Sequence, residues 1–177
     1  QLGKTDMTVS EVALGCEGMI GAAPQLVDAL VKTALESGMN FLDIFCAEPD
    51  VRDNVGVSLK GRRQEMYIQG HIGSCWRDGQ YLRSREAQHV KPAFEDLMAR
   101  LGTDYLDVGV IHYVDNDPDY DTVFNGWFID YVLALKKTGR IHYTGLSSHN
   151  PTTALRAVKN GLIDVLLFSV NPCYDLQ

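Results

Sequence analysis

A histidine stands at the end of the most apolar run of the sequence, followed directly by acidic residues. Residues 101–115 read LGTDYLDVGVIHYVD, and residues 105–114 are mostly β-branched, aromatic or aliphatic. Such a run predicts a strand buried on both faces, as in parallel sheets covered by helices. Chemistry in these folds takes place at the carboxyl ends of the strands, where His112 lies. An imidazole there is a candidate acid, base or polarising group, and a histidine hydrogen-bonded inside the core is the alternative.

Other potential ligands and titratable groups also follow predicted strands. Thiols and imidazoles at one face could bind zinc or an iron centre. The alternative is that the cysteines are small apolar residues that fill space near the strand ends. We favour this alternative because the first and last predicted strands lie far apart, so the residues that follow them would not meet at one metal ion. We therefore predict no metal site. The residues concerned are Cys16, Cys46, Cys75 and Cys173, with His71, His112 and His149.

Four aspartates follow the same predicted strand at alternate positions. They resemble a calcium loop only superficially, because the glycine and the terminal glutamate of that motif are missing. We predict a solvated acidic loop that caps the next helix. The residues are Asp115, Asp117, Asp119 and Asp121.

The elements that position these residues alternate between strand and helix. Apolar runs predict strands, and apolar residues at helical spacing between turn signals predict helices. The predicted strands cover residues 12–16, 41–45, 66–72, 105–114, 141–147 and 164–170, and the predicted helices cover residues 25–36, 51–59, 84–100, 122–137 and 151–159. Residues 73–83 are predicted to form a polar loop.

This alternation predicts a single α/β domain over residues 1–177 with a parallel sheet. The first strand–helix turn, GCEGMIGAAP, lacks the GxGxxG spacing of a dinucleotide-binding open sheet. The pattern therefore favours a (β/α)8 TIM barrel with about six of its eight βα units in this chain. An unclosed barrel has two unpaired edges, so we expect that Gln177 is not the natural end of the protein or that the remainder is not included.

The composition is that of an ordinary globular protein, with 45% hydrophobic and 22% charged residues. The net charge of -7 argues against nucleic acid or an anionic membrane as a partner. No apolar run reaches the roughly 20 residues that cross a bilayer. The four cysteines lack CxxC spacing, which favours reduced thiols in a cytoplasmic protein.

Several segments together resemble the aldo-keto reductase family. The opening LGKTDMTVSEVALG is similar to that family's first hairpin and strand, GMNFLD to its second strand, RLGTDYLDVGVIH to its fourth and KTGRIHYTGLS to its fifth. The likeness covers essentially the whole chain and is closest to a bacterial branch in which a ferredoxin-like iron–sulfur segment often follows the barrel. Residues 1–177 contain no such segment.

The resemblance implies a catalytic set of Asp, Tyr, Lys and His, of which half is replaced. Asp43 and His112 match the aspartate and the histidine, whereas Glu48 stands near the expected tyrosine and His71 at the expected lysine. Three interpretations follow. The site is inactive and the fold serves binding, or His71 paired with Asp43 acts as the acid, or a buried, protonated Glu48 donates the proton. A solvated Glu48 is a further alternative.

The alignment leaves open which aromatic residues line the mouth of the barrel. Tyr81, Tyr113 and Phe45 are the candidates.

The resemblance also implies NADPH as cofactor. Ser147 matches the family's nicotinamide-contacting serine, Ser148 replaces the adjacent asparagine, and Asn171 is a third candidate contact. Leu167 stands where the family has glutamine. Because the phosphate and adenosine site would follow strands seven and eight, we expect this chain to bind NADPH weakly or not at all.

The leading hypothesis is an NADPH-dependent oxidoreductase acting on a small-molecule carbonyl substrate. In it, Asp43 and His71 form a polarising pair and His112 places the substrate oxygen. The alternative is a non-catalytic barrel that serves as a binding or electron-transfer partner domain. The residues give no prediction of the oligomeric state.

Overall fold

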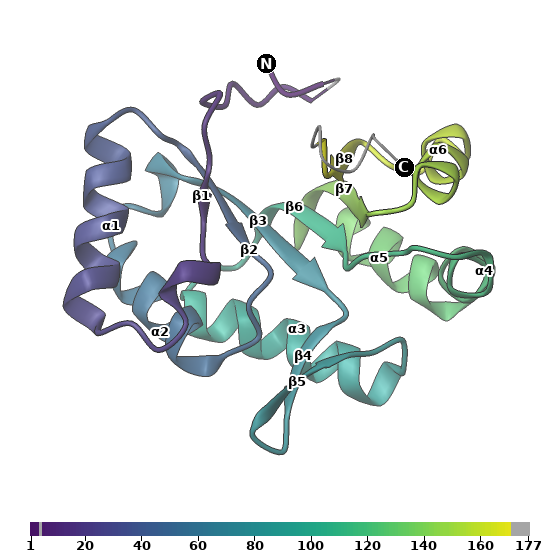
Figure 1. Cartoon of the computed structure of the whole chain (residues 1–177), viewed down its shortest axis with the longest axis horizontal. Coiled ribbons are helices and arrows are strands. Elements are labelled where there is room, and N and C mark those ends of the chain that lie inside the picture. The colour runs from purple at the N-terminus through teal and green to yellow at the C-terminus, as the bar shows by residue number, and fades with distance from the viewer. Residues whose placement is uncertain (4, 171–177) are drawn as a thin grey trace.

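Six parallel strands lie side by side in the order in which they occur along the chain (Figure 1). The computed structural model describes residues 1–3 and 5–170. A doubly wound sheet reverses its strand order at a switch point, whereas sequential order with a helical connection after each strand is that of a barrel. The prediction of a partial (β/α)8 barrel is confirmed. The strands are β1 (Leu14–Gly15), β2 (Phe41–Ile44), β3 (Tyr67–Ile72), β6 (Leu106–Ile111), β7 (Ile141–Ser148) and β8 (Val165–Phe168).

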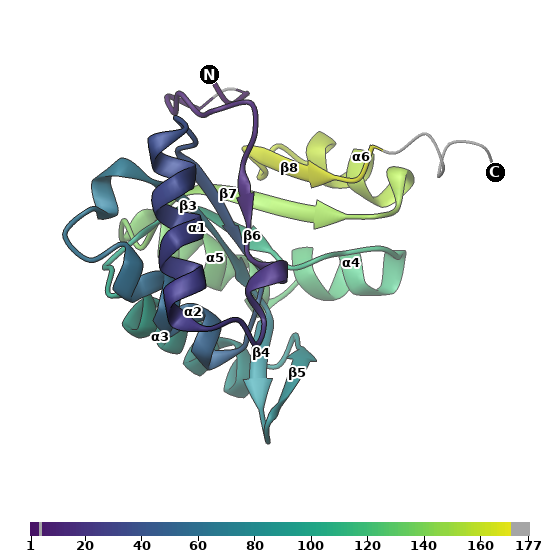
Figure 2. The same cartoon turned by 60° about the vertical axis from the view of Figure 1, so that its left-hand side comes forward.

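The helices lie along the outer face of this sheet and follow its curvature (Figures 1 and 2). Several begin at a proline, whose fixed φ suits the first helical turn. The α-helices are α1 (Pro24–Glu36), α2 (Pro49–Ser58), α3 (Ala87–Leu101), α4 (Asp117–Phe124), α5 (Trp127–Lys137) and α6 (Pro151–Lys159), and the short 3₁₀ helices are η1 (Glu17–Met19) and η2 (Arg63–Glu65).

The helix predicted over residues 122–137 is wrong, because α4 and α5 replace it. The side chain of Asn116 accepts a hydrogen bond from the amide of Asp119 at 2.9 Å and so caps α4. The chain leaves the helical conformation at Asn125 and Gly126. The predicted acidic loop is therefore largely the first helical turns of α4.

The polar loop predicted over residues 73–83 is also wrong, since it forms an antiparallel hairpin of β4 (Ser74–Arg77) and β5 (Gln80–Arg83). Its turn consists of Asp78 and Gly79, with φ angles of 52° and 79°. Two successive positive φ angles match the turn type that suits the twist of paired strands, and Asp-Gly is a preferred pair for it. The hairpin projects from the barrel beyond the end of β3 (Figure 2).

The first residues of the chain do not form the hairpin that the resemblance implied. Among the described residues before β1, no strand occurs, and the amide of Leu2 donates to the carbonyl of Met7 at 2.9 Å. Met7 is buried against Phe41, Val108 and Val110, on the interior face of the barrel. Met7 therefore packs against the barrel interior although the described residues around it add no strand.

Side chains of each strand alternate between the barrel interior and the helical layer. On β2, Leu42 and Ile44 are buried in the large cluster beneath the helices, whereas Phe41 belongs to the interior cluster. Asp43 shares the interior face with Phe41. This alternation directs a carboxylate on a buried strand toward the mouth.

A close approach between two helices of the outer layer requires glycine. A Cβ atom on Gly56 of α2 would lie 2.1 Å from the carbonyl oxygen of Arg100 on α3. No side chain fits there without separating the two helices.

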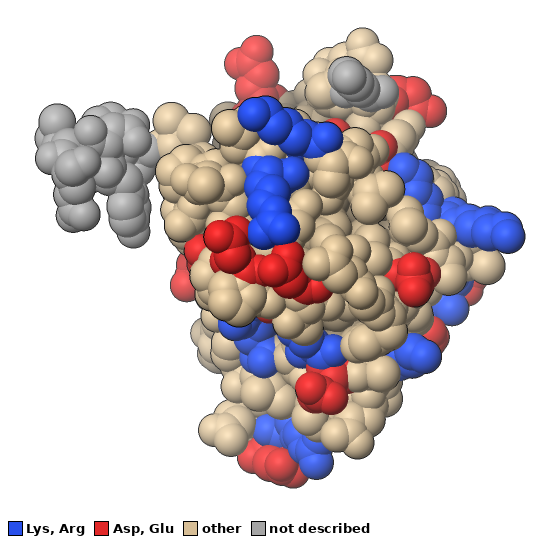
Figure 3. All heavy atoms as spheres, turned by 90° about the vertical axis from the view of Figure 1, so that its right-hand side faces the viewer, with Lys and Arg blue, Asp and Glu red and all other residues tan. Residues whose placement is uncertain are grey.

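Charged side chains of both signs are interspersed on the face that includes α4 and α6 (Figure 3). Arg156 of α6 lies 2.8 Å from carboxylate oxygens of both Asp117 and Asp121 of α4.

Within the described residues, none of the helices has the length and apolar character that a membrane span requires.

Candidate functional site at the mouth of the barrel

Three polar side chains meet where the neighbouring strands β2, β3 and β6 end. Asp43 and His71 lie just before the ends of β2 and β3, and His112 directly follows β6. His71 Nε2 lies 3.1 Å from Asp43 Oδ1, and His71 Nδ1 lies 2.8 Å from Nδ1 of His112. Parallel strands bring their carboxyl ends to one edge, so residues distant in sequence form a hydrogen-bonded row.

Asp43 is held in the ionised form. Burial alone would raise the pKa of its carboxyl, but hydrogen bonds from His71 and from Gln69 outweigh burial and hold that pKa below its ordinary value. The amide of Gln69 donates to Asp43 Oδ1 at 2.7 Å. A negative charge therefore faces His71 at neutral pH.

The contacts of His71 restrict where protons can lie. Its Nε2 faces the Asp43 carboxylate and must carry a hydrogen, whereas the contact with His112 has room for one hydrogen between two nitrogens. Either His71 is an imidazolium that donates at both nitrogens, or His112 donates from Nδ1 to a neutral His71. These two arrangements differ by one proton.

His112 itself stays neutral. Its side chain is buried, and burial lowers the pKa of its imidazole to about 2, together with nearby positive charge from His71, Arg85 and Arg83. Any additional proton in the row therefore lies on His71, beside the carboxylate of Asp43.

The row continues to a tyrosine of the hairpin. The hydroxyl of Tyr81 on β5 lies 2.7 Å from Nε2 of His112. Burial raises the pKa of this phenol, and the neighbouring Tyr113 raises it further. The phenol therefore keeps its proton at neutral pH. Four side chains thus form one continuous series, from Asp43 through His71 and His112 to Tyr81.

The base of the hairpin is anchored to α4. Arg85 donates to Asp119 from Nε and from its terminal nitrogen, both at 2.9 Å, and also to the main-chain carbonyl of His112 at 2.7 Å. Arg83 contacts the same carboxylate at 2.6 Å. Burial alone would raise the pKa of Asp119, but the hydrogen bonds and charges of the two arginines lower it. The prediction that this aspartate belongs to a solvated loop is wrong, because its side chain is 10% exposed.

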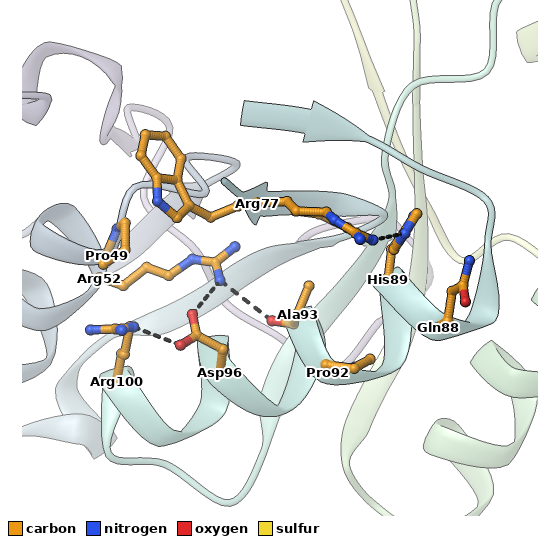
Figure 4. A pocket seen from close by; sticks show the side chains of 11 residues that line it. Pro49, Arg52, Arg77, Gln88, His89, Pro92, Ala93, Asp96 and Arg100 are labelled. Carbon is orange, nitrogen blue, oxygen red and sulfur yellow. Dashed lines mark hydrogen bonds and ion pairs between the residues drawn. The ribbon is translucent and has the colours of Figure 1, made fainter. Parts of the chain in front are cut away.

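A second anchor lies on the outer side of the hairpin, in a cavity of about 350 Å³ between α2, β4 and α3 (Figure 4). Arg52 reaches across it and donates to the carbonyls of Cys46 and Ser74 at 3.1 and 3.3 Å. It also pairs with Asp96 at 3.0 Å. The Arg52 side chain is 1% exposed, so its guanidinium joins the loop after β2 to the start of the hairpin.

The four side chains face a different cavity, of about 460 Å³, at the mouth of the barrel. Aromatic walls with a few polar groups are typical of sites for small organic molecules. Phe45, Tyr81 and Tyr113, the candidates for the mouth, all line it. The complete lining is Glu17, Asp43, Phe45, His71, Tyr81, His112, Tyr113, Ser147, His149 and Leu167.

Of the residues predicted to contact the cofactor, some line the mouth cavity and others do not. Ser147 is buried and lines the cavity. Ser148 is buried as well, but its hydroxyl donates to the carbonyl of Val114 at 2.7 Å, and Ser148 is not part of the cavity lining. Leu167, at the position of the family's glutamine, lines the cavity with an apolar side chain. Asn171 lies outside the described residues.

Glu48 precedes α2 and is half-buried. It does not belong to the cavity lining, whereas the other three predicted catalytic residues do. Its role as a proton donor stays a prediction.

Three of the four cysteines lie among the described residues. Cys16, Cys46 and Cys75 are buried free thiols, and burial raises the pKa of each, that of Cys46 to about 12. Residues 1–3 and 5–170 contain no group of three or more His, Cys, Asp or Glu side chains arranged to hold a metal. Cys173 lies outside this part of the chain.

Sequence reasoning missed that Tyr81 contacts His112 and that Arg85 and Asp119 hold the hairpin. The available signal was Asp78-Gly79 between the aromatic-containing segments SCWR and QYLR. Read as a hairpin turn, it would have placed Tyr81 on a strand beside the mouth.

Comparison with known proteins agrees with this geometry. The sequence model of the aldo/keto reductase family matches residues 17–174. The uncharacterized oxidoreductase YqkF of Bacillus subtilis is 29% identical over 167 residues, which are 92% of this chain and 53% of that protein. Probable aldo-keto reductase 1 of Glycine max is 27% identical over 89% of this chain and 46% of that protein. The chain thus spans about half the length of these curated relatives.

Two solved structures are similar throughout the chain. A putative aldo-keto reductase from Pseudomonas aeruginosa superposes with a TM-score of 0.84 at 27% identity, covering 98% of this chain and 67% of that one. Aldo-keto reductase AKR11C1 from Bacillus halodurans, in its holo form, superposes with a TM-score of 0.81 at 29% identity, covering 96% of this chain and 56% of that one. Because the family match extends over most of the sequence and the barrel is shared, the chain belongs to the aldo/keto reductase family.

Proposed function

We propose that the protein is an NADPH-dependent oxidoreductase that reduces a small carbonyl compound with an altered catalytic set. The observation that carries the proposal is the hydrogen-bonded row of Asp43, His71 and His112 facing a cavity at the barrel mouth. Family membership supports the reaction class, and the aromatic lining suits a small organic substrate.

Each residue of the row has a distinct part. Asp43 stabilises a positive charge on His71, as an aspartate does for the lysine of the family. His71 thereby replaces the cation that polarises the site. His112, neutral and buried, sets the position of the substrate oxygen at the end of β6, the fourth strand of the barrel.

The cofactor fits the described residues in part. A reduced nicotinamide, when bound, supplies the hydride that converts a carbonyl carbon to an alcohol carbon. Ser147 would contact its carboxamide from the cavity wall. No lysine or arginine is among the described residues that line the cavity, so cofactor phosphates would need other residues.

A non-catalytic barrel is the second candidate. Two observations favour it: Leu167 offers no hydrogen bond where the family has glutamine, and the lining has no basic side chain. Such a protein would keep the scaffold and bind a partner without turnover.

One assay on the full-length protein separates the two candidates. NADPH oxidation is followed against a panel of small aldehydes and ketones for the wild type, His71→Ala and His112→Ala. His142→Ala is the matched control, since His142 is an exposed histidine at the opposite end of the barrel. We expect turnover by the wild type and the control, and a loss of about 10²- to 10⁴-fold in the two site variants.

Activity indifferent to both site changes would contradict the assigned roles. Failure of the wild type to bind NADPH in a fluorescence titration would favour the non-catalytic barrel.

A further inference from the structure

We propose that Tyr81, a residue of the β4–β5 hairpin, is the catalytic acid that donates a proton to the substrate's carbonyl oxygen. This inference rests on the proposed reduction and names the group that completes it. The tyrosine comes from a different part of the chain than Glu48, the position at which the family resemblance places the acid.

The geometry puts the phenol, and not the imidazole, nearest the substrate. Nε2 of His112 is its one ring nitrogen that does not face His71, and the Tyr81 hydroxyl occupies it at 2.7 Å. Tyr81 lines the mouth cavity and is 40% exposed, whereas His112 is 5% exposed. A carbonyl oxygen in the cavity therefore meets the phenol first, and His112 positions that oxygen through Tyr81.

The hydrogen bonds define a loaded state that can give up a proton. In it, an imidazolium at His71 donates from Nε2 to Asp43 and from Nδ1 to Nδ1 of His112. His112 then carries its single hydrogen on Nε2 and donates it to the oxygen of Tyr81. The row then makes no use of the hydroxyl hydrogen of Tyr81, which can be donated to a carbonyl oxygen in the cavity that Tyr81 and Tyr113 line.

Proton transfer along the row needs no other acid. As the carbonyl carbon gains a hydride, which the reduced nicotinamide of the proposed reaction would supply, the carbonyl oxygen takes the hydroxyl proton of Tyr81. The phenolate oxygen takes the Nε2 proton of His112, and Nδ1 of His112 takes the Nδ1 proton of His71. The carbonyl is reduced to an alcohol, His71 ends neutral, and Asp43 stays ionised. The discharged arrangement is the second one that the contacts allow, with His112 donating from Nδ1 and accepting from Tyr81.

Two features suit this sequence of transfers. The environment disfavours a free phenolate at Tyr81 and a doubly protonated His112, so neither persists between transfers. The side chain of Asp43 is 24% exposed, so water can reach the end of the row at which His71 is reloaded.

The kinetic test compares Tyr81→Phe with Tyr143→Phe in the full-length protein. Both remove one tyrosine hydroxyl, but that of Tyr143 contacts Asp6, far from the mouth. We expect Tyr81→Phe to lower kcat for carbonyl reduction by about 10²- to 10⁴-fold, with little change in KM or in NADPH binding. Tyr143→Phe should retain wild-type turnover. A kcat of Tyr81→Phe within a few-fold of the wild type overturns the inference and leaves the proposed reduction standing.

A second readout needs neither substrate nor cofactor. In ¹⁵N-histidine, ¹³C-tyrosine-labelled protein, His112 should exchange one neutral tautomer for the other as the row passes from one of its two arrangements to the other. The ¹³Cζ resonance of Tyr81 should move together with the resonances of His112, and that movement should vanish in His71→Ala. A Tyr81 resonance that stays fixed while the histidines change overturns the inference, whatever the activity. Wild-type protein that reduces no carbonyl contradicts the proposed function instead.

Discussion

The hydroxyl of Tyr81 lies 2.7 Å from Nε2 of His112, although the two residues are 31 positions apart, Tyr81 in strand β5 of the hairpin and His112 directly after barrel strand β6. This contact joins the hairpin to the barrel strands and extends the row that begins at Asp43. The mouth of the barrel is therefore assembled from two structural units. The hairpin must be held firmly for the row to persist, and the arginines at its base provide the anchor.

The neutral state of His112 should appear in the stability of the protein. Its pKa is lowered in the native state to about 2, by burial and by His71, Arg85, Arg83 and His149. In the unfolded chain the pKa of this histidine is about 6.5, so the unfolded ring binds a proton that the native ring excludes. The free energy of unfolding therefore decreases as the pH falls below about 6.5. His112→Gln should reduce the slope of unfolding free energy against pH by about 1.4 kcal/mol per unit.

The measurement is urea unfolding at several values between pH 4.5 and 6. His142→Gln, which replaces an exposed ring, serves as the control. An equal slope in His112→Gln and the wild type would mean that the native ring accepts the proton.

The anchor of the hairpin depends on the geometry of an arginine. Lysine at position 85 keeps the positive charge but cannot donate at once to Asp119 and to the carbonyls of His112 and Tyr113. Because a largely buried carboxylate would lose part of its pairing, Arg85→Lys should lower the unfolding free energy by about 3 kcal/mol. Arg62→Lys, in an exposed pair with Glu65, should change it little. Equal stability of the two variants in urea would exclude this role.

Helices α2 and α3 should tolerate no side chain at their contact. In Gly56→Ala the added methyl would meet the carbonyl of Arg100 at 2.1 Å, so the helices must separate. We expect a loss of about 1–3 kcal/mol in unfolding free energy. Gly18→Ala is the matched control, because a Cβ there meets no atom within 4 Å. A thermal midpoint of Gly56→Ala equal to that of Gly18→Ala would contradict the contact.

The barrel could be predicted because its signals are local. Each buried strand reads as an apolar run, and turn residues such as Gly38 and Gly139 mark the helix ends. Alternation of strands and helices then leaves few topologies, so the gathering of Asp43, His71 and His112 at one edge followed. The sequence prediction did not divide residues 117–137 into two helices, although Asn125 and Gly126 are residues that commonly end a helix.

The rest of the site could not be predicted because it depends on long-range contacts. That Arg83 and Arg85 turn inward to Asp119 follows from where α4 packs, which no local pattern states. The position of Tyr81 depends in turn on that anchor. A hydrogen bond between a hairpin strand and the residue that follows a barrel strand leaves no periodic pattern in the sequence.

The central claim, that Asp43, His71, His112 and Tyr81 act as one proton-transfer unit in carbonyl reduction, is tested most directly by a double-mutant cycle. The kcat of the full-length protein is measured for His71→Gln, Tyr81→Phe and the double variant, with folding checked by circular dichroism. If the residues act as a unit, removing any one of them removes the function of all. The kcat of each single variant and of the double variant should therefore fall by about the same factor, on the order of 10²- to 10⁴-fold. A double variant whose loss is the product of the two single losses would show that His71 and Tyr81 act independently, and would contradict the account.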